Sequence, residues 1–248
     1  MKTALITGGG SGIGQALARA LAERGLRVIV AGRTADTLAQ TQQRYPEQIH
    51  TVVADVGTAA GRDILVKAVK AHGDLQYIVH NAALVKPLKP LQTLDLEQWR
   101  QAQAVNVEAP LFLTQQLVPL MTRGRVLHIS SGLAHRALSG MAAYCISKAA
   151  LHMAYLVCQA DYADSAVLFG SVRPGTVDTP MQNKLRAADA EDLPVSGFFQ
   201  DLKANDQLLS PAEVATGLRW LLLDSSDGYF TQQDWLIADI LPYAHHPD

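Results

Sequence analysis

The alternation of short β-branched runs with longer helical patterns is the feature that most constrains the fold of this chain. The predicted strands are 3–7, 27–31, 49–54, 76–80, 125–129, 166–172 and 235–238. An amphipathic helical stripe between the first two strands consists of Ile13, Leu17, Ala20 and Leu21. Regular β-then-α order predicts an α/β fold, in which about seven strands form a doubly wound parallel sheet with helices on both faces.

Composition favours a single domain and disfavours several classes of partner. The 248 residues are 48% hydrophobic, which suits one large core over 1–248. The net charge of -2 and the lack of a like-charged block disfavour nucleic acid and a membrane surface as partners. No apolar run approaches the ~20 residues that span a bilayer. Only Cys145 and Cys158 are present, so we expect no disulfide framework and a soluble, cytoplasmic protein.

A glycine-rich turn, TGGGSGIG at 7–14, lies between the first predicted strand and the first helix. Glycines permit close backbone approach, and the free N–H groups at a helix start attract a phosphate. A P-loop would end in Gly-Lys-Ser/Thr, whereas Gly14 is followed by Gln15, which disfavours a nucleoside triphosphatase. The spacing of Gly8, Gly12 and Gly14 also differs from G-x-G-x-x-G. Dinucleotide binding is favoured, with a methyltransferase turn or a purely structural turn as the alternatives.

The end of the second strand indicates which dinucleotide binds. An acid at this place would bind a ribose 2′-hydroxyl, whereas a nearby arginine accommodates a 2′-phosphate. Here the strand is followed by Arg33, and the first acid is Asp36. This order favours NADP(H) over NAD(H), the alternative being that Arg33 is an ordinary solvated arginine.

Tyr144 and Lys148 lie one helical turn apart in the stretch AAYCISK. Side chains at i and i+4 share one face of a helix, and a neighbouring ammonium is expected to lower the pKa of a phenol. Ser131 follows the fifth strand, where its hydroxyl can hold a substrate oxygen beside the tyrosine. The three residues predict general acid–base chemistry on that oxygen.

Pro110 is predicted to interrupt a helix in AVNVEAPLFL. Because proline lacks an N–H, the main-chain carbonyl of Asn106, four residues earlier, loses its helical partner. That carbonyl can hold a water that links Lys148 to solvent and resupplies the proton given up by Tyr144. A simple kink is the equally weighted alternative.

Seven short motifs occur in a family-like order and spacing. They are TGGGSGIG at 7–14, Asp55-Val56, HNAA at 80–83, Asn106-Val107, ISS at 129–131, YCISK at 144–148, and RPG at 173–175 followed by Thr179. By these motifs the chain resembles the short-chain dehydrogenase/reductase family over essentially its whole length. The stretches 172–186 and 202–215 are more specifically similar to its sepiapterin reductase and benzil reductase branch.

The resemblance implies a Rossmann-like fold, a homodimer or homotetramer, and a role for each matching residue. The implied catalytic tetrad is Asn106, Ser131, Tyr144 and Lys148. The implied cofactor contacts are Gly8, Ser11, Gly12, Ile13, Gly14, Asp55, Val56, Asn81, Ala82, Tyr144, Lys148, Pro174, Val177 and Thr179. Among these, Asp55 and Val56 would face the adenine, and Val177 and Thr179 would bind the carboxamide. The implied substrate contacts are Ser131, Tyr144, Met181 and Asp239, the last an acid at the carboxyl end of the final strand.

Two regions depart from the family pattern or lack regular patterning. Ala83 stands where the family usually has a glycine near the adenosine ribose, so the local backbone fit is expected to differ. The segment 174–211 is irregular, with a short helix expected around 181–188. We interpret this segment as a lid over a substrate pocket, the alternative being disorder in the free protein.

No metal site is expected from the histidines. His128, His135 and His152 lack HExxH spacing and are not grouped with acids in the sequence, so local structural roles are favoured.

Together the residues predict an NADPH-dependent reductase that acts on a small carbonyl compound. The expected substrate is a ketone or 1,2-dicarbonyl, with a pterin side chain or an aromatic diketone as examples. One alternative is a non-enzymatic NADP(H)-binding redox sensor or scaffold. The other is an alcohol-oxidising dehydrogenase, which would use the same residues.

Overall fold

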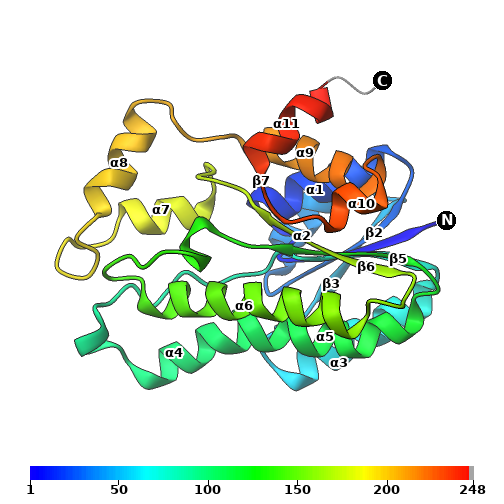
Figure 1. Ribbon diagram of the computed structural model, residues 1–248, viewed down its shortest axis with the longest axis horizontal. Helices are drawn as coiled ribbons and strands as arrows, with labels where there is room; N and C mark the ends of the chain where they lie inside the picture. Colours follow the sequence, from blue (N-terminus) through cyan, green and yellow to red (C-terminus); the bar gives the residue numbers. More distant parts are fainter. Residues whose placement is uncertain (246–248) are drawn as a thin grey trace.

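Seven parallel strands form the centre of the computed structural model, which describes residues 1–245 (Figure 1). Their order across the sheet is β3-β2-β1-β4-β5-β6-β7. The strands are β1 (Thr3–Thr7), β2 (Arg27–Gly32), β3 (Ile49–Val53), β4 (Leu75–His80), β5 (Gly124–Ile129), β6 (Val167–Arg173) and β7 (Asp234–Leu236). The predicted fold class and all seven predicted strands are confirmed, with small shifts of the strand ends.

Helices cover both faces of the sheet. They are α1 (Gly12–Glu23), α2 (Ala35–Gln42), α3 (Ala59–His72), α4 (Leu96–Gln103), α5 (Ala109–Leu117), α6 (Ala142–Asp161), α7 (Pro180–Arg186), α8 (Ser196–Ala204), α9 (Pro211–Leu223), α10 (Asp227–Thr231) and α11 (Ile237–His245). Short turns complete the chain: η1 (Leu91–Thr93), η3 (Val118–Leu120) and η4 (Gly132–Ala134) are 3₁₀ turns, and η2 (Ala104–Glu108) is a π-helical turn.

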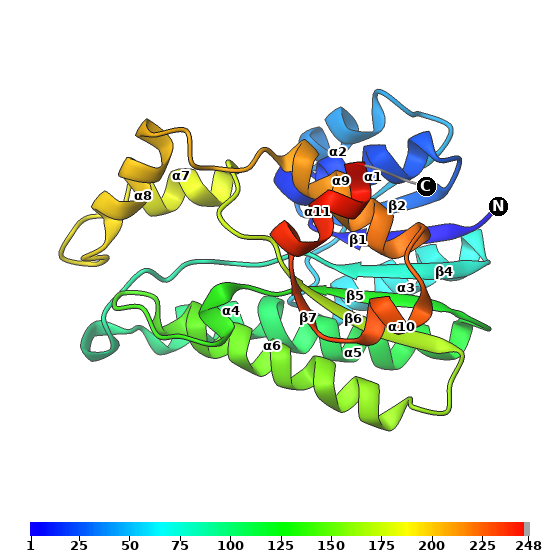
Figure 2. The same ribbon diagram turned by 45° about the horizontal axis from the view of Figure 1, so that its top comes forward.

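Two apolar cores lie on opposite sides of the sheet, and Figure 2 shows the helices that cover them, with α1 and α9 on one side and α5 and α6 on the other. On one side, α1 and α9 pack together, with Leu17 and Leu218 fully buried. On the other side, α3, α5 and α6 bury Leu65, Leu113 and Tyr155. Because both faces are covered, the central strand β1 is apolar or small throughout and buried at every residue, as parallel strands require.

The strand order places a crevice at the carboxyl edge of the sheet. β1 lies between β2 and β4, so the chain winds outward from β1 in both directions. The connections after β1 and β4 therefore leave in opposite directions, and ligands of doubly wound sheets bind in the crevice between them.

The segment 174–211 contains two helices, so its prediction as largely irregular is wrong in part. The expected short helix is present as α7, but α8 was not expected. Phe199 of α8 is buried in an apolar cluster with Leu185 and Leu193. These partners lie in other parts of the segment, so local periodicity did not reveal them. Figures 1 and 2 show α7 and α8 projecting from the sheet as one lobe.

The last predicted strand, 235–238, ends earlier than expected because α11 begins at Ile237. Ile237, Ile240 and Ala244 are buried at helical spacing, and α11 packs against α9. Asp239 consequently lies on the first turn of a helix and is exposed, instead of ending a strand.

Within residues 1–245, no helix is both long enough and apolar enough to cross a membrane.

Candidate active site

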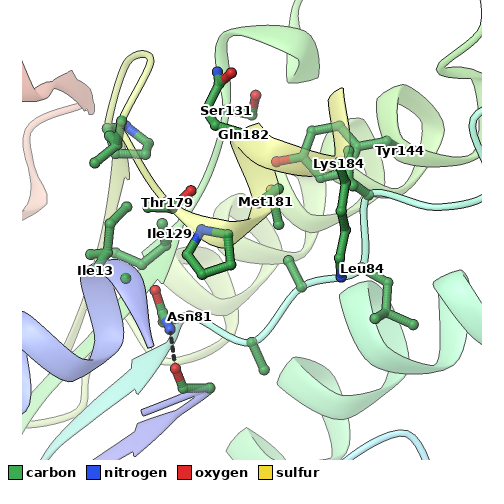
Figure 3. A pocket seen from close by; sticks show the side chains of 18 of the residues that line it. Ile13, Asn81, Leu84, Ile129, Ser131, Tyr144, Thr179, Met181, Gln182 and Lys184 are labelled. Carbon is green, nitrogen blue, oxygen red and sulfur yellow. Dashed lines mark hydrogen bonds between the residues drawn. The ribbon is translucent and has the colours of Figure 1, made fainter. Parts of the chain in front are cut away.

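A pocket of about 940 Å³ lies where the predicted site residues converge. Its walls come from the connections that follow β1, β2, β4, β5 and β6, and from α6 and α7. The predicted residues that line it are Gly8, Ser11, Gly12, Ile13, Arg33, Asp55, Val56, Asn81, Ala82, Ser131, Tyr144, Lys148, Pro174, Val177, Thr179 and Met181. Figure 3 shows side chains of this pocket at close range. Gly14, Asn106 and Asp239 are absent from its lining.

Tyr144 reaches the pocket from the first turn of α6 and is buried apart from its pocket side. Burial raises the pKa of the phenol to about 12, and the neighbouring Ser131 hydroxyl only partly offsets this. The phenol is therefore protonated at neutral pH. A protonated phenol beside a serine hydroxyl is suited to donate a proton to a substrate oxygen.

Ser131 directly follows β5 and begins the 3₁₀ turn η4. Its Oγ accepts a hydrogen bond from the main-chain N–H of Leu133, at 3.1 Å, which fixes the side chain at the start of the turn. The fold thus brings Ser131 and Tyr144 together from the end of a strand and the start of a helix, as predicted from their positions.

Lys148 lies one turn after Tyr144 and is 3% exposed. Its Nζ donates a hydrogen bond of 2.6 Å to the main-chain carbonyl of Ile129, and lies 5.7 Å from the centre of the Tyr144 ring. Burial lowers the pKa of Lys148 to about 8. The ammonium is therefore a charged, buried donor that faces the pocket at neutral pH.

The expectation that Lys148 lowers the pKa of Tyr144 is not met in this structure. The net shift of the phenol is upward because burial is the largest effect on it. Lys148 directs its ammonium to the carbonyl of Ile129, so the strongest contact of this charge is with the end of β5.

Asn106 lies in the π-helical turn between α4 and α5, where Pro110 was predicted to interrupt the helix. Its side chain is 1% exposed and forms hydrogen bonds with Leu84 and Ser147. The Oδ1 accepts from the N–H of Leu84 at 2.7 Å, and the Nδ2 donates to the carbonyl of Leu84 at 2.8 Å and to Ser147 Oγ at 2.9 Å. This side chain holds the loop after β4 against α6, and a catalytic role for Asn106 remains a prediction about its main-chain carbonyl.

The glycine turn has the shape of a phosphate cradle. Gly12 has a φ of +53°, which favours glycine, and it lies at the start of α1. A Cβ on Gly14 would lie 2.4 Å from the carbonyl oxygen of Gly8, so only glycine fits there. Asn81 Nδ2 donates to the carbonyls of Thr7 and Gly8, at 2.9 and 3.1 Å; Figure 3 marks one of these bonds. Gly14 and the Asn81 side chain therefore shape the turn that would bind the pyrophosphate of a dinucleotide.

Arg33 and Asp55 lie at the far end of the pocket from Tyr144, on the connections after β2 and β3. Arg33 is exposed, and the described part of the chain contains no carboxylate paired with it. Thr34 and Thr37 also line this end and were missed by sequence reasoning. Their positions in the sequence, shortly after Arg33, could have indicated them, because hydroxyls near an arginine suit the binding of an anionic group.

The connection after β6 folds back onto the glycine turn. A Cβ on Gly12 would lie 3.0 Å from Thr179 Cγ2, so the two loops are in close contact. Main-chain hydrogen bonds to Leu209 hold this connection, from Asp178 N to Leu209 O at 2.9 Å and from Leu209 N to Thr176 O at 3.0 Å. The contact brings Val177 and Thr179 to the wall of the pocket that the glycine turn, Ser131, Tyr144 and Lys148 also line.

The end of the pocket near Tyr144 is mainly apolar. It is lined by Leu84, Val85, Leu133, Leu138, Met141, Met181, Leu185, Val195, Phe198 and Phe199, with the polar exceptions Arg136, Gln182 and Lys184. Figure 3 shows Met181, Gln182 and Lys184 on α7, with Ser131 and Tyr144 also on the pocket wall. Apart from Met181, sequence reasoning missed these residues, because they come from separate segments with no shared motif.

Asp239 does not reach this pocket. It lies on the exposed side of α11, whose buried side packs on α9. The expectation of a substrate-binding acid at this position depended on a final strand that reaches 238, whereas β7 ends at Leu236 and Asp239 lies on α11.

His135 and His152 are grouped with an acid, contrary to the expectation from their spacing in the sequence. Their ring nitrogens approach the Asp234 carboxylate, and the three ligand atoms lie within 4.8 Å of one another. Asp234 begins β7, far along the chain from both histidines, so no local pattern indicated this cluster. The cluster lies outside the pocket lining.

Comparison with known proteins agrees with this site. The sequence model described as short chain dehydrogenase matches residues 2–190. The 2,3-dihydro-2,3-dihydroxybenzoate dehydrogenase of Escherichia coli is 33% identical over 243 residues, covering 95% of each chain. The benzil reductase of Bacillus cereus, which forms (S)-benzoin, is 30% identical and covers 90% of this chain and 94% of its own. The crystal structure of the KRED1-Pglu enzyme superposes with a TM-score of 0.88 at 25% identity, covering 95% of this chain and all of its own. With its fold, its pocket and these matches, the chain belongs to the short-chain dehydrogenase/reductase family of oxidoreductases.

Proposed function

We propose that this protein is an NADPH-dependent reductase that converts a ketone or 1,2-dicarbonyl compound to an alcohol. The observation that carries the proposal is that the buried Tyr144 phenol, Ser131 and Lys148 line one pocket together with the glycine turn at 8–12. Proton donor and cradle are the two parts that reduction of a carbonyl by a bound nicotinamide requires.

In the proposed reaction the nicotinamide, when bound, supplies the hydride. Ser131 holds the substrate oxygen by a hydrogen bond, and Tyr144 donates its proton to that oxygen as negative charge develops there. Lys148 presents a buried ammonium that attracts this developing charge, and it is the candidate donor to the nicotinamide ribose. The main-chain carbonyl of Asn106 is the candidate anchor of the water that returns a proton to Tyr144.

Arg33 supports NADPH over NADH. It lines the pocket without a paired carboxylate among the described residues, and Thr34 and Thr37 add hydroxyls beside it. An arginine with neighbouring hydroxyls can hold a 2′-phosphate, whereas a free ribose 2′-hydroxyl would be matched by an acid at this position.

The apolar lining favours an aromatic or otherwise bulky carbonyl substrate. Phe198, Phe199, Met141 and Leu138 surround the space beside Tyr144. The similarity to a benzil reductase supports an aromatic diketone as a member of the substrate class.

We also propose a homodimer or homotetramer in the cytoplasm. The α5–α6 face has exposed apolar side chains, namely Leu111, Phe112, Ile146, Met153, Leu156 and Val157. A patch of this kind is typical of an interface between subunits. Cys145 and Cys158 are both free thiols, which is compatible with a reducing compartment.

The direct test is NADPH oxidation by the purified protein with aromatic diketones, pterins and simple ketones. Tyr144→Phe keeps the ring and removes the proton donor, so we expect it to reduce turnover by at least roughly 10²–10⁴-fold while NADPH binding stays nearly unchanged. Turnover by Tyr144→Phe at the wild-type rate would contradict the assignment of Tyr144 as the proton donor.

Two further outcomes separate the alternatives. A protein that binds NADPH but reduces no member of the panel would favour a redox-responsive binding protein. A protein that oxidises the matching alcohols with NADP⁺ but leaves the carbonyl compounds unreduced would favour a dehydrogenase.

A further inference from the structure

His135, His152 and Asp234 form a side-chain cluster outside the active-site pocket. His135 follows η4, His152 lies on α6, and Asp234 begins β7. His135 Nε2 lies 2.9 Å from Asp234 Oδ2, and His152 Nδ1 lies 3.7 Å from the same oxygen. Three chain segments therefore direct one ligand atom each toward a common point.

Two features show that this cluster is more than a chance surface contact. Asp234 is largely buried, and its other oxygen, Oδ1, accepts a hydrogen bond of 2.8 Å from Ser171 Oγ. Ser171 and Asp234 face each other in the register of β6 and β7, so the carboxylate is held in a fixed orientation. His152 Nδ1 is buried and has no hydrogen-bond partner among the described residues. A buried polar atom without a partner is costly, so this nitrogen favours a bound ion or water at the cluster.

We propose that these three residues bind a divalent transition-metal ion. Two imidazoles and one carboxylate suit Zn²⁺, Ni²⁺, Co²⁺ or Cu²⁺, whereas Mg²⁺ and Ca²⁺ prefer oxygen ligands. Ligand atoms about 2.0–2.2 Å from a tetrahedral metal lie roughly 3.3–3.6 Å from one another. The histidine nitrogens lie 2.9 and 3.7 Å from Asp234 Oδ2, on either side of that range, and all three ligand atoms lie within 4.8 Å of one another, so side-chain rotations of the histidines would complete the site.

The surrounding hydrogen bonds resemble the outer shell of a protein metal site. Ser171 holds Asp234 Oδ1 and leaves Oδ2 to the metal, as a partner of a ligating carboxylate does. His135 is partly exposed, which leaves a path for the ion and room for water as a fourth ligand.

Arg173 is the competitor of the metal. Its Nε lies 3.2 Å from Asp234 Oδ2, the proposed ligand atom. Its Nη2 also donates to the main-chain carbonyl of Asp234 at 2.9 Å, so the side chain stays anchored when the Nε contact is given up. The positive charge of Arg173 opposes a cation at this position. Its removal is therefore expected to tighten metal binding.

The site links the loop that contains Ser131 to two other elements. His135 lies on the short connection after η4, and Ser131 begins that turn. A bound metal would tie this connection to α6 and β7. The proposal concerns metal binding itself and stands apart from the reductase activity.

The test is calorimetric titration of the full-length protein with ZnCl₂ and NiCl₂, with Co²⁺ absorption in the visible range as an independent signal. All variants are made in a His245→Ala/His246→Ala background, which removes two further imidazoles near the end of the chain. We expect one metal ion per chain. His135→Gln and His152→Gln are each expected to weaken binding at least about tenfold, and Arg173→Gln to strengthen it by a similar factor.

The matched control is a second close histidine pair, His50 and His72, whose ring centres lie 4.4 Å apart. Among residues 1–245, no acidic side chain lies close enough to this pair to form a group of three possible metal ligands. The double variant His50→Gln/His72→Gln is expected to bind metal as the parent does. Because His135 is partly exposed, His135→Gln is expected to fold, which thermal unfolding without metal verifies.

Two results would overturn the proposal. One is metal binding that is unchanged in both His135→Gln and His152→Gln. The other is no measurable binding by either the parent protein or Arg173→Gln.

Discussion

Because Lys148 is buried, its side chain keeps its positive charge only up to mildly alkaline pH. The pKa of this ammonium is lowered to about 8 by desolvation, while that of Tyr144 is raised to about 12. Both groups are therefore protonated at neutral pH, and Lys148 is the first of the two to lose its proton as the pH rises. An ammonium that loses its charge no longer attracts the negative charge that develops on the substrate oxygen.

We therefore expect kcat for carbonyl reduction to be nearly constant from pH 6 to 7 and to decline above about pH 8. The sign follows from the lowered pKa, because the lysine is charged below it and neutral above it. A kcat profile between pH 6 and 10 measures this. A flat profile across that whole range would show that the charge of Lys148 does not act in the reaction.

At Arg33, the prediction concerns the choice of cofactor. Arg33→Ala is expected to weaken NADPH binding on the order of 10- to 100-fold, because a charged hydrogen bond to a phosphate is lost. NADH binding is expected to change little. Fluorescence titration with both nucleotides measures the two affinities. The control is Arg44→Ala, an arginine outside the pocket lining, and equal losses for NADPH and NADH in Arg33→Ala would contradict a 2′-phosphate contact.

At the level of elements, the π-helical turn between α4 and α5 has a direct structural consequence. Pro110 removes one helical N–H, and the widened turn at 104–108 holds Asn106 inside the protein. The Asn106 side chain then joins the loop after β4 to α6, which contains Tyr144 and Lys148. One irregular helical turn therefore connects two walls of the pocket.

The α5–α6 face is the element on which the proposed oligomer depends. Met153 and Val157 of α6 are 57% and 46% exposed, and they lie one turn apart on the same side of the helix. The double variant Met153→Lys/Val157→Lys is expected to convert a dimer or tetramer to smaller species, because the charges cannot be buried at an apolar interface. Sedimentation velocity measures the change.

A control for this experiment is Leu91→Lys, which alters an exposed apolar residue on η1, away from this face. It is expected to leave the assembly unchanged. A wild-type protein that is monomeric at all concentrations would contradict the proposed homo-oligomer.

At the scale of the whole molecule, two buried histidines make stability depend on pH. His80 and His128 pair in the register of β4 and β5, with ring centres 5.1 Å apart and both side chains in the core. Burial lowers the pKa of His128 to about 4 and that of His80 well below its ordinary value. The native state therefore holds both rings neutral, whereas the unfolded chain binds a proton on each below about pH 6.5.

The free energy of unfolding is consequently expected to fall as pH drops from about 6.5 to 4, by about 3 kcal/mol from His128 alone. Urea unfolding at pH 7.5 and pH 5 measures the loss. His128→Leu, which cannot be protonated, is expected to lose less stability between these pH values than the wild type. Equal losses in the two proteins would show that His128 is not the source.

Much of the fold and of the site could be predicted because the relevant information is local. Hydrophobic periodicity predicted the strands, and the glycine turn follows directly from β1 in the chain. Tyr144 and Lys148 share a helix face at a spacing that any helix would produce. The residues that the sequence predicted wrongly or did not predict depend on contacts between segments that lie far apart in the chain. Asp239 was predicted at the end of the last strand, but β7 ends at Leu236 and α11, which packs on α9 with Ile237 and Ile240 buried, begins directly after it.

The sequence by itself determined the parallel α/β sheet, the glycine turn after β1 and the shared helix face of Tyr144 and Lys148, because short-range sterics, periodicity and helix geometry set each of them. Only the tertiary structure decided the apolar lining of the substrate end, the packing of α8, and the meeting of His135, His152 and Asp234. These features join segments that are far apart in the chain. Their positions follow from how the whole core packs, and no local spacing encodes that arrangement.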